Sequence, residues 1–136
     1  MNERELINLA LIARKNAYAP YSHYYVGAAV LAASGSIYTG CNIENASFGA
    51  TNCAERTAVF KAVSEGEKKL LAIAIVGGAD EESEQYAFPC GICRQVLREF
   101  SNPEELVVLV ARSASDYKKY LLKNLLPESF GPEQLQ

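Results

Sequence analysis

The sequence lacks the dense basic runs that are typical of proteins that bind nucleic acids. Its 13 Lys and Arg residues are outnumbered by 16 Asp and Glu residues, which gives a net charge of −3, and no basic run is longer than a pair such as Lys68-Lys69. Binding to the phosphate backbone of DNA or RNA depends on clustered positive charge. The composition therefore favours a small-molecule substrate over a polynucleotide.

A long hydrophobic segment is also missing at the start of the sequence. The first residues, MNERELINLALIARKNAYAP, interrupt their apolar side chains with Glu3, Arg4, Glu5 and Arg14. A secretory signal needs an unbroken apolar stretch, and a membrane-spanning helix needs a longer one. We therefore expect a cytoplasmic protein that does not associate with membranes.

Linkers, internal repeats and low-complexity segments are absent as well. The chain has 136 residues, of which 49% are hydrophobic and 21% are charged, as in an ordinary globular protein. A chain of this length can bury a hydrophobic core without cross-links. We expect one domain that spans residues 1–136.

Cysteines are few, but their placement is informative. The 4 cysteines are Cys41, Cys53, Cys90 and Cys93. Four cysteines without a secretion signal argue against a disulfide framework and favour metal binding or thiol chemistry.

The hydrophobic pattern predicts alternating helices and strands. Helices are expected over residues 3–17, from Cys53 to a stop near Gly66, and from the segment PCGIC to residue 100; strands are expected over residues 26–32, 37–43, 70–76 and 106–110. The first two strands form a hairpin, and the last two are apolar throughout and pair in parallel. Residues 117–126 are ambiguous between a further strand and a short helix. The pattern indicates an α/β domain with a mixed sheet.

Three of the cysteines lie where helices are expected to begin. The free N–H groups and partial positive charge of a helix start favour a thiolate, the form that binds a metal. Cys53, Cys90 and Cys93 could hold a tetrahedral zinc ion and leave its fourth position to water. Glu55 is then placed to take a proton from that water and pass it on, and Arg56 could donate hydrogen bonds to the sulfurs.

Simpler interpretations exist for each of these residues. Cys41 could complete a structural cage of four cysteines, although it lies on a strand-like run where a thiol packed in the core is common. Glu55 could merely interact with the helix dipole, and Arg56 could be a surface charge. His23, the only histidine, lies in a polar loop where such a residue is usually exposed.

Two segments together resemble the cytidine deaminases of nucleoside salvage, in their three-cysteine form. The segments are CAERTAVFKAVSEG, which begins at Cys53, and PCGICRQVLREF, which contains Cys90 and Cys93. They match the general signature of zinc deaminases, a Cys or His followed by x-Glu and later by Pro-Cys-x-x-Cys. The segments YAPYSHYYVGAAV, GCNIENASFG and LLPESFGPEQL are also similar to family segments, so that the resemblance covers nearly the whole chain.

The resemblance implies a reaction. Cys53, Cys90 and Cys93 would bind one zinc ion per subunit, and a zinc hydroxide would attack C4 of the cytosine ring. Glu55 would protonate N3 and then the departing amino group. Cytidine and 2′-deoxycytidine would thereby yield uridine and 2′-deoxyuridine with release of ammonia.

The resemblance also implies the substrate pocket and the assembly. Asn42 and Glu44 match residues that bind the sugar hydroxyls, Tyr24 matches an aromatic residue that lines the base pocket, and the backbone of Ala54 would help to fix the base. Phe130 matches a residue that reaches a neighbouring subunit's active site, which implies a homotetramer with active sites at subunit interfaces. The implied fold is a three-layer α/β/α sandwich with a mixed, mainly parallel sheet of about five strands.

Other functions are compatible with parts of this pattern. A deaminase of another cytosine nucleoside, such as blasticidin S, would share the zinc motifs, although CNIENAS favours a ribose-binding site. A polynucleotide deaminase is disfavoured by the acidic balance. A structural zinc module without catalytic activity would bind metal but would have no open coordination position.

Overall fold

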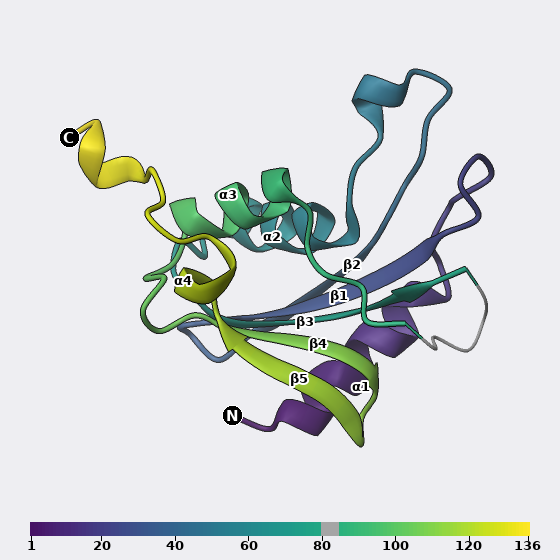
Figure 1. Cartoon of the computed structure of the whole chain (residues 1–136), viewed down its shortest axis with the longest axis horizontal. Helices are drawn as coiled ribbons and strands as arrows, with labels where there is room; N and C mark the ends of the chain where they lie inside the picture. The colour runs from purple at the N-terminus through teal and green to yellow at the C-terminus, as the bar shows by residue number, and fades with distance from the viewer. Residues whose placement is uncertain (80–84) are drawn as a thin grey trace.

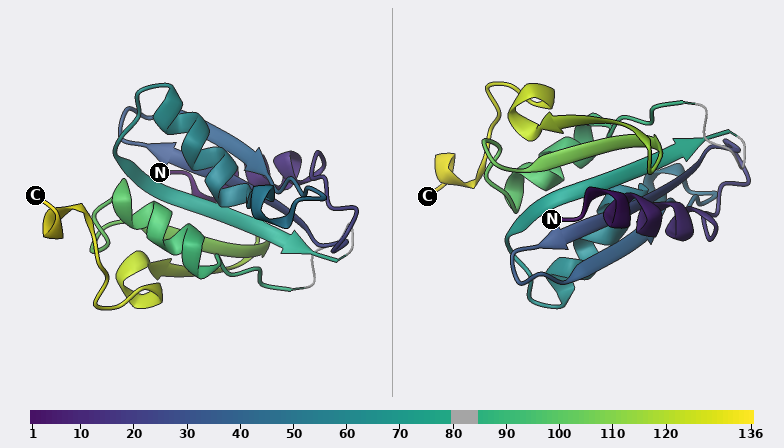
Figure 2. Two further views of the ribbon diagram at one scale, coloured as in Figure 1. Left: turned by 90° about the horizontal axis from the view of Figure 1, so that it is seen from above. Right: turned by 90° about the horizontal axis from the view of Figure 1, so that it is seen from below.

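A computed structural model describes residues 1–79 and 85–136 and contains a five-stranded sheet between two layers of helices (Figure 1). The strands are β1 (Tyr25–Ala32), β2 (Ile37–Cys41), β3 (Leu70–Gly78), β4 (Val107–Ser113) and β5 (Asp116–Leu121), in the spatial order β2-β1-β3-β4-β5. Helices α2 (Ala54–Ser64) and α3 (Gly91–Glu99) cover one face, and α1 (Glu3–Arg14) covers the other (Figure 2). The predicted three-layer α/β/α sandwich is confirmed.

The sheet is mixed, as predicted, but it is not mainly parallel. Among the five strands of the described residues, β3 and β4 are the one parallel pair; β1 is antiparallel to both β2 and β3, and β5 is antiparallel to β4. Short hairpins impose antiparallel pairing between β1 and β2 and between β4 and β5. The error has a physical reason, because an unbroken apolar run such as LLAIAIV reports burial on both faces of a sheet and not strand direction.

The helices begin close to where the sequence predicts. Asn2 caps α1 by accepting a hydrogen bond from the Glu5 N–H, while Cys53 and Cys90 are the N-cap residues of α2 and α3. Helix α1 ends at Arg14, three residues before the predicted end, because the chain turns so that Tyr18 can form a β-bridge with Ile43. Both alternatives for residues 117–126 are present, since β5 is followed by the short helix α4 (Leu122–Leu125).

A hydrophobic core lies on each face of the sheet. One cluster joins the sheet to α2 and α3, and includes Ala58, Ile73 and Leu97; the other joins it to α1, and includes Ile7 and Ala74. Within residues 1–79 and 85–136, two short 3-10 helices are also present, Phe48–Ala50 and Pro132–Gln134. Among the residues that the structure describes, no helix combines the length and the hydrophobicity needed to cross a membrane.

Candidate metal centre and active site

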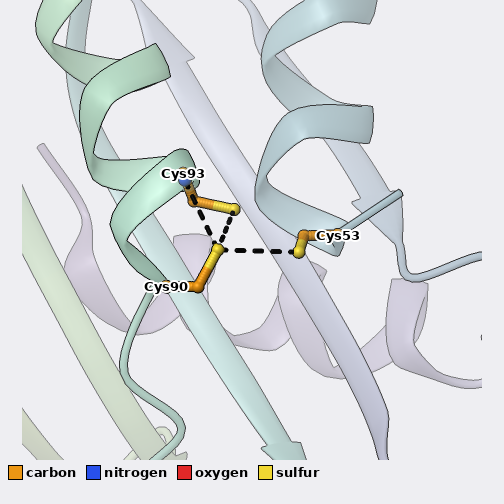
Figure 3. Close-up of side chains that lie close together, drawn as sticks. All are labelled: Cys53, Cys90 and Cys93. Carbon is orange, nitrogen blue, oxygen red and sulfur yellow. Dashed lines mark hydrogen bonds between the residues drawn. The ribbon is translucent and has the colours of Figure 1, made fainter. Parts of the chain in front are cut away.

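The first turns of α2 and α3 bring three cysteines together (Figure 3). The Sγ atom of Cys90 lies 3.9 Å from that of Cys53 and 3.4 Å from that of Cys93, and all three sulfurs lie within 4.8 Å of one another. Cys93 is fully buried, whereas Cys90 is exposed. The group is therefore shielded from solvent at Cys93 and accessible to solvent at Cys90.

The sulfur cluster has the dimensions of a zinc site. Zn–S bonds of about 2.3 Å in tetrahedral geometry place the sulfurs about 3.8 Å apart. The separations of the Cys90 sulfur from the Cys93 and Cys53 sulfurs, 3.4 and 3.9 Å, bracket that value. Three thiolates are also a donor set that suits zinc, and they leave one tetrahedral position for a water molecule. These three residues are positioned to bind a metal ion.

The electrostatic environment favours at least one thiolate. A hydrogen bond from Cys93 and the adjacent Arg56 guanidinium lower the pKa of Cys53 to about 5. The same hydrogen bond, together with burial, raises the pKa of Cys93. Cys93 must therefore lose a proton to act as a thiolate ligand, which makes metal affinity dependent on pH.

Arg56 lies against the sulfurs, as the sequence predicts. Its Nη2 donates a hydrogen bond of 3.0 Å to Cys53 Sγ. Its Nε is buried and has no hydrogen-bond partner within the described residues, 1–79 and 85–136. A partly buried cation with a spare donor suits a centre at which negative charge accumulates as thiolates form.

Glu55 is a buried carboxyl group beside the cysteines. Glu55 is only 4% exposed, and this burial raises the pKa of its carboxyl group to about 7. The negative charge of Cys53 acts in the same direction, while a hydrogen bond from Cys93 opposes it. A carboxyl group that exchanges its proton near neutral pH is suited to general acid–base work.

The start of α2 is fixed by a short chain of polar contacts. Asn52 Nδ2 donates to Thr57 Oγ1, and this hydroxyl donates to the Cys53 carbonyl, each bond being 3.1 Å long. Ala54, the first residue of α2, is fully buried. Asn52 before the N-cap and Thr57 in the helix thus together fix the backbone that carries Cys53 and Ala54.

Tyr24 is half-buried and directly precedes β1. Burial raises the pKa of Tyr24, Arg14 lowers it, and the negative charge of Glu55 adds to the increase. The ionisation of Tyr24 is therefore coupled to that of Glu55.

Asn42 and Glu44 follow β2 and hold neighbouring loops. Asn42 accepts a 2.9 Å hydrogen bond from the Val26 N–H and donates one of 2.7 Å to the Tyr24 carbonyl. Glu44 accepts hydrogen bonds from the N–H groups of Tyr21 and Ser22 and from the Ser22 hydroxyl. The hydroxyl contact in particular lowers the pKa of Glu44. Ser22 is not among the residues predicted from the sequence, because no local pattern shows which distant carboxylate a loop hydroxyl will contact.

The remaining candidates lie on other segments of the chain than the cysteines of the metal-binding group. Phe130 is 57% exposed in the C-terminal segment, where its carbonyl accepts a hydrogen bond from Gln95. Cys41 is half-buried at the end of β2 and is not part of the metal-binding group found among the described residues. The four-cysteine cage is therefore wrong. His23 is exposed and has a positive φ of 56°.

Comparison with known families gives a match over most of the chain. Residues 1–110 match the family described as cytidine and deoxycytidylate deaminase zinc-binding region. A curated cytidine deaminase of Halalkalibacterium halodurans is 44% identical over 135 residues, which cover 99% of this chain and 98% of that protein. A probable cytidine deaminase of Dictyostelium discoideum is 44% identical over 138 residues, with coverage of 99% and 90%.

Solved structures show the same fold. The crystal structure of cytidine deaminase from Burkholderia pseudomallei has a TM-score of 0.85 at 43% identity and covers 96% of this chain and 100% of its own. The structure of cytidine deaminase from Mycobacterium tuberculosis has a TM-score of 0.81 at 39% identity, with coverage of 96% and 98%. Both the sequence and the fold of this chain are thus similar to these proteins along nearly their whole length.

Proposed function

Because the chain belongs to the cytidine and deoxycytidylate deaminase family, we propose that it converts cytidine and 2′-deoxycytidine to uridine and 2′-deoxyuridine. One water molecule is consumed and one ammonia is released: a C–O bond forms at C4 of the base, and the bond from C4 to the amino nitrogen breaks. The observation that carries the proposal is the group of three cysteines at two helix starts with the buried carboxyl of Glu55 beside it.

We assign the metal to Cys53, Cys90 and Cys93. A zinc ion bound there supplies a Lewis acid that makes a water molecule reactive near neutral pH. Arg56 offsets the negative charge of the thiolates through its hydrogen bond to Cys53. Because Cys53 and Cys90 lie at helix N-termini, the helix dipoles also stabilise the thiolates.

Glu55 moves the protons in this proposal. As a carboxylate it takes a proton from the attacking water, and as a carboxylic acid it gives that proton to N3 of the base. It then carries the second proton to the amino group that leaves as ammonia. The burial that raises its pKa to about 7 makes both forms accessible near neutral pH.

The substrate is held by residues on both sides of the cluster. Tyr24 offers its ring to the base, and the backbone of Ala54 offers its polar groups. Asn42 and Glu44 retain capacity for sugar hydroxyls: the Asn42 amide has a second hydrogen and a second lone pair, and carboxylate oxygens accept more than one hydrogen bond. A hydroxyl both donates and accepts, so it complements this pair of residues.

We further propose that residues 1–136 form one deaminase domain, that the protein acts in the cytoplasm, and that it assembles as a homotetramer. In that assembly Phe130, whose side chain is exposed, would reach the active site of a neighbouring subunit. The names of the relatives favour cytidine over blasticidin S as the substrate. The net charge of −3 disfavours a polynucleotide.

The first experiment measures ammonia release from cytidine, 2′-deoxycytidine and free cytosine by zinc-loaded and by chelator-stripped protein. We expect turnover of the two nucleosides only, lost on stripping and restored by zinc. Turnover of free cytosine at the same rate would contradict the roles of Asn42 and Glu44. Absence of turnover with all three compounds in folded protein that contains one zinc per chain would contradict the proposed function.

A further inference from the structure

Arg94, on the first turns of α3, joins two backbone segments that are distant in the sequence. Its Nε donates a 2.7 Å hydrogen bond to the Pro89 carbonyl, and its Nη1 donates one of 2.6 Å to the Leu125 carbonyl. Both bonds are partly buried. A guanidinium group is planar and rigid, so two bonds from one group fix the two carbonyls relative to each other.

The first of these carbonyls belongs to the peptide that leads into a cysteine of the metal group. Pro89 is buried and directly precedes Cys90, the N-cap residue of α3. Long side chains on a helix point back towards its N-terminus, which is how Arg94 reaches over the turn that carries Cys90 and Cys93. The Arg94 N–H also donates to the Cys90 carbonyl at 3.0 Å. Arg94 thus holds the peptides on both sides of the Cys90 Cα atom.

The second carbonyl provides a fixed anchor. Leu125 ends α4, where the last carbonyls of a helix have no partner within the helix. The start of α4 is tied down by the Leu122 N–H, which donates to the Leu106 carbonyl, and the Leu122 side chain is fully buried. Arg94 therefore holds the segment before Cys90 against an element that is itself packed on the core.

The neighbouring polar residues of α3 serve a different purpose. Gln95 donates to the Phe130 carbonyl, and Arg98 contacts Ser129 and forms an ion pair with Glu133. These bonds hold the C-terminal segment, but none of them touches the peptide before Cys90. On the same helix, Arg94 thus contacts the segment before Cys90, whereas Gln95 and Arg98 contact the C-terminal segment.

We propose that Arg94 is a positioning residue of the metal centre. By clamping the Pro89 carbonyl to α4, it sets the direction in which Cys90 Sγ points and keeps this sulfur near those of Cys53 and Cys93. Cys90 needs this support because it is exposed, unlike Cys93. The inference rests on the proposed function only in taking the three cysteines as the metal ligands.

The test is an equilibrium competition for zinc between the protein and a chromophoric chelator. Removal of residues that orient metal ligands typically weakens metal binding by about 10–100-fold. We expect a loss in this range for Arg94→Met, which keeps an unbranched apolar side chain but has no hydrogen-bond donor. Gln95→Met is the matched control: it also removes one side-chain bond to a backbone carbonyl from the adjacent position, and its zinc affinity should equal that of the wild type.

A third variant keeps the test decisive if Arg94→Met does not fold. Arg94→Lys retains the charge but has a compact ammonium group in place of the planar fork, so it should bind zinc more weakly than the wild type. Wild-type affinity in Arg94→Lys, or an equal loss in Gln95→Met and Arg94→Met, would overturn the proposal. Wild-type protein that binds no zinc would refute the proposed metal site itself, whereas unchanged affinity in Arg94→Met would refute only the role of Arg94.

Discussion

Gly40 allows α2 to pack closely on the sheet, and its replacement by alanine tests how the structure positions the metal group. A Cβ atom at this position of β2 would lie 2.5 Å from the Ala58 nitrogen and 2.8 Å from the Ala54 oxygen, both in the backbone of α2. Ordinary van der Waals contacts begin at 3.4 Å. Since backbone atoms cannot turn aside, the helix and the strand must separate by about 0.9 Å, which is the difference between these distances.

The size of the effect follows from this separation. Inserting a methyl group into a close-packed contact typically costs about 1–3 kcal/mol of unfolding free energy. Because α2 moves as a rigid element, the shift also reaches Cys53 and Glu55 in its first turn. A displacement of about 1 Å in a catalytic group can reduce turnover about 100-fold. Gly40→Ala should therefore lower both stability and activity.

The assay compares urea unfolding and cytidine turnover of zinc-loaded wild type, Gly40→Ala and Gly49→Ala. Apart from its own chain neighbours, no heavy atom lies within 4 Å of the position that a Cβ would occupy at Gly49, so its variant should stay within about 0.5 kcal/mol of the wild type. Both substitutions reduce the freedom of the unfolded chain in the same way, so their difference reports the steric cost. A Gly40→Ala protein with the unfolding midpoint and turnover of the wild type would refute the reasoning.

Four further predictions concern the site. Glu55→Gln should keep bound zinc while kcat falls by about 10²–10⁴-fold, as measured by metal analysis and ammonia release. Cys93→Ala should lose zinc on dialysis, whereas Cys41→Ala should retain one zinc per chain, because Cys41 lies outside the metal-binding group. The hydrogen bond from Ser22 lowers the pKa of Glu44 in the folded protein. The stability that Glu44 contributes is therefore complete above its ordinary pKa and is lost as pH falls through the lowered value. The thermal unfolding temperature of Glu44→Gln should accordingly depend less on pH in acid than that of the wild type. If the proposed homotetramer forms, Phe130→Ala and Glu55→Gln subunits, each weakly active alone, should regain activity in ammonia release when they are unfolded together and refolded as a mixture, because some sites would combine an intact Glu55 with a neighbour's intact Phe130.

Most elements of the fold could be predicted because their signals are local. The helix starts at Cys53 and Cys90 and the apolar strands around Ile73 and Leu109 follow from neighbouring residues alone. Strand direction could not be predicted in this way, because it depends on which strands become neighbours across the sheet. The antiparallel pairing of β1 with β3 joins residues that are far apart in the sequence, such as Ala28 and Ile75.

The site shows the same division. The spacing of Cys53 and Glu55, and of Cys90 and Cys93, is a local signal, and the structure places all four residues together. Other contacts around the site are long-range and left no recognisable pattern in the sequence. Arg94 binds the Leu125 carbonyl, and Ser22 binds Glu44, across loops whose approach depends on the complete fold.

The topology explains why the two cysteine motifs meet. Since β1 is antiparallel to both β2 and β3, and β4 is parallel to β3, the strands β2, β3 and β4 all run in one direction. Helix α2 connects β2 to β3, and α3 connects β3 to β4, so each helix returns antiparallel to these strands and starts at the same edge of the sheet. Both connections advance across the sheet in the same direction, from β2 towards β4. Connections between parallel strands are almost always right-handed, so both helices lie on the same face of the sheet, as Figure 2 shows. Two helix N-termini, each with a partial positive charge, thus converge on one point, and a cluster of thiolates is more stable there than at a point reached by only one helix start.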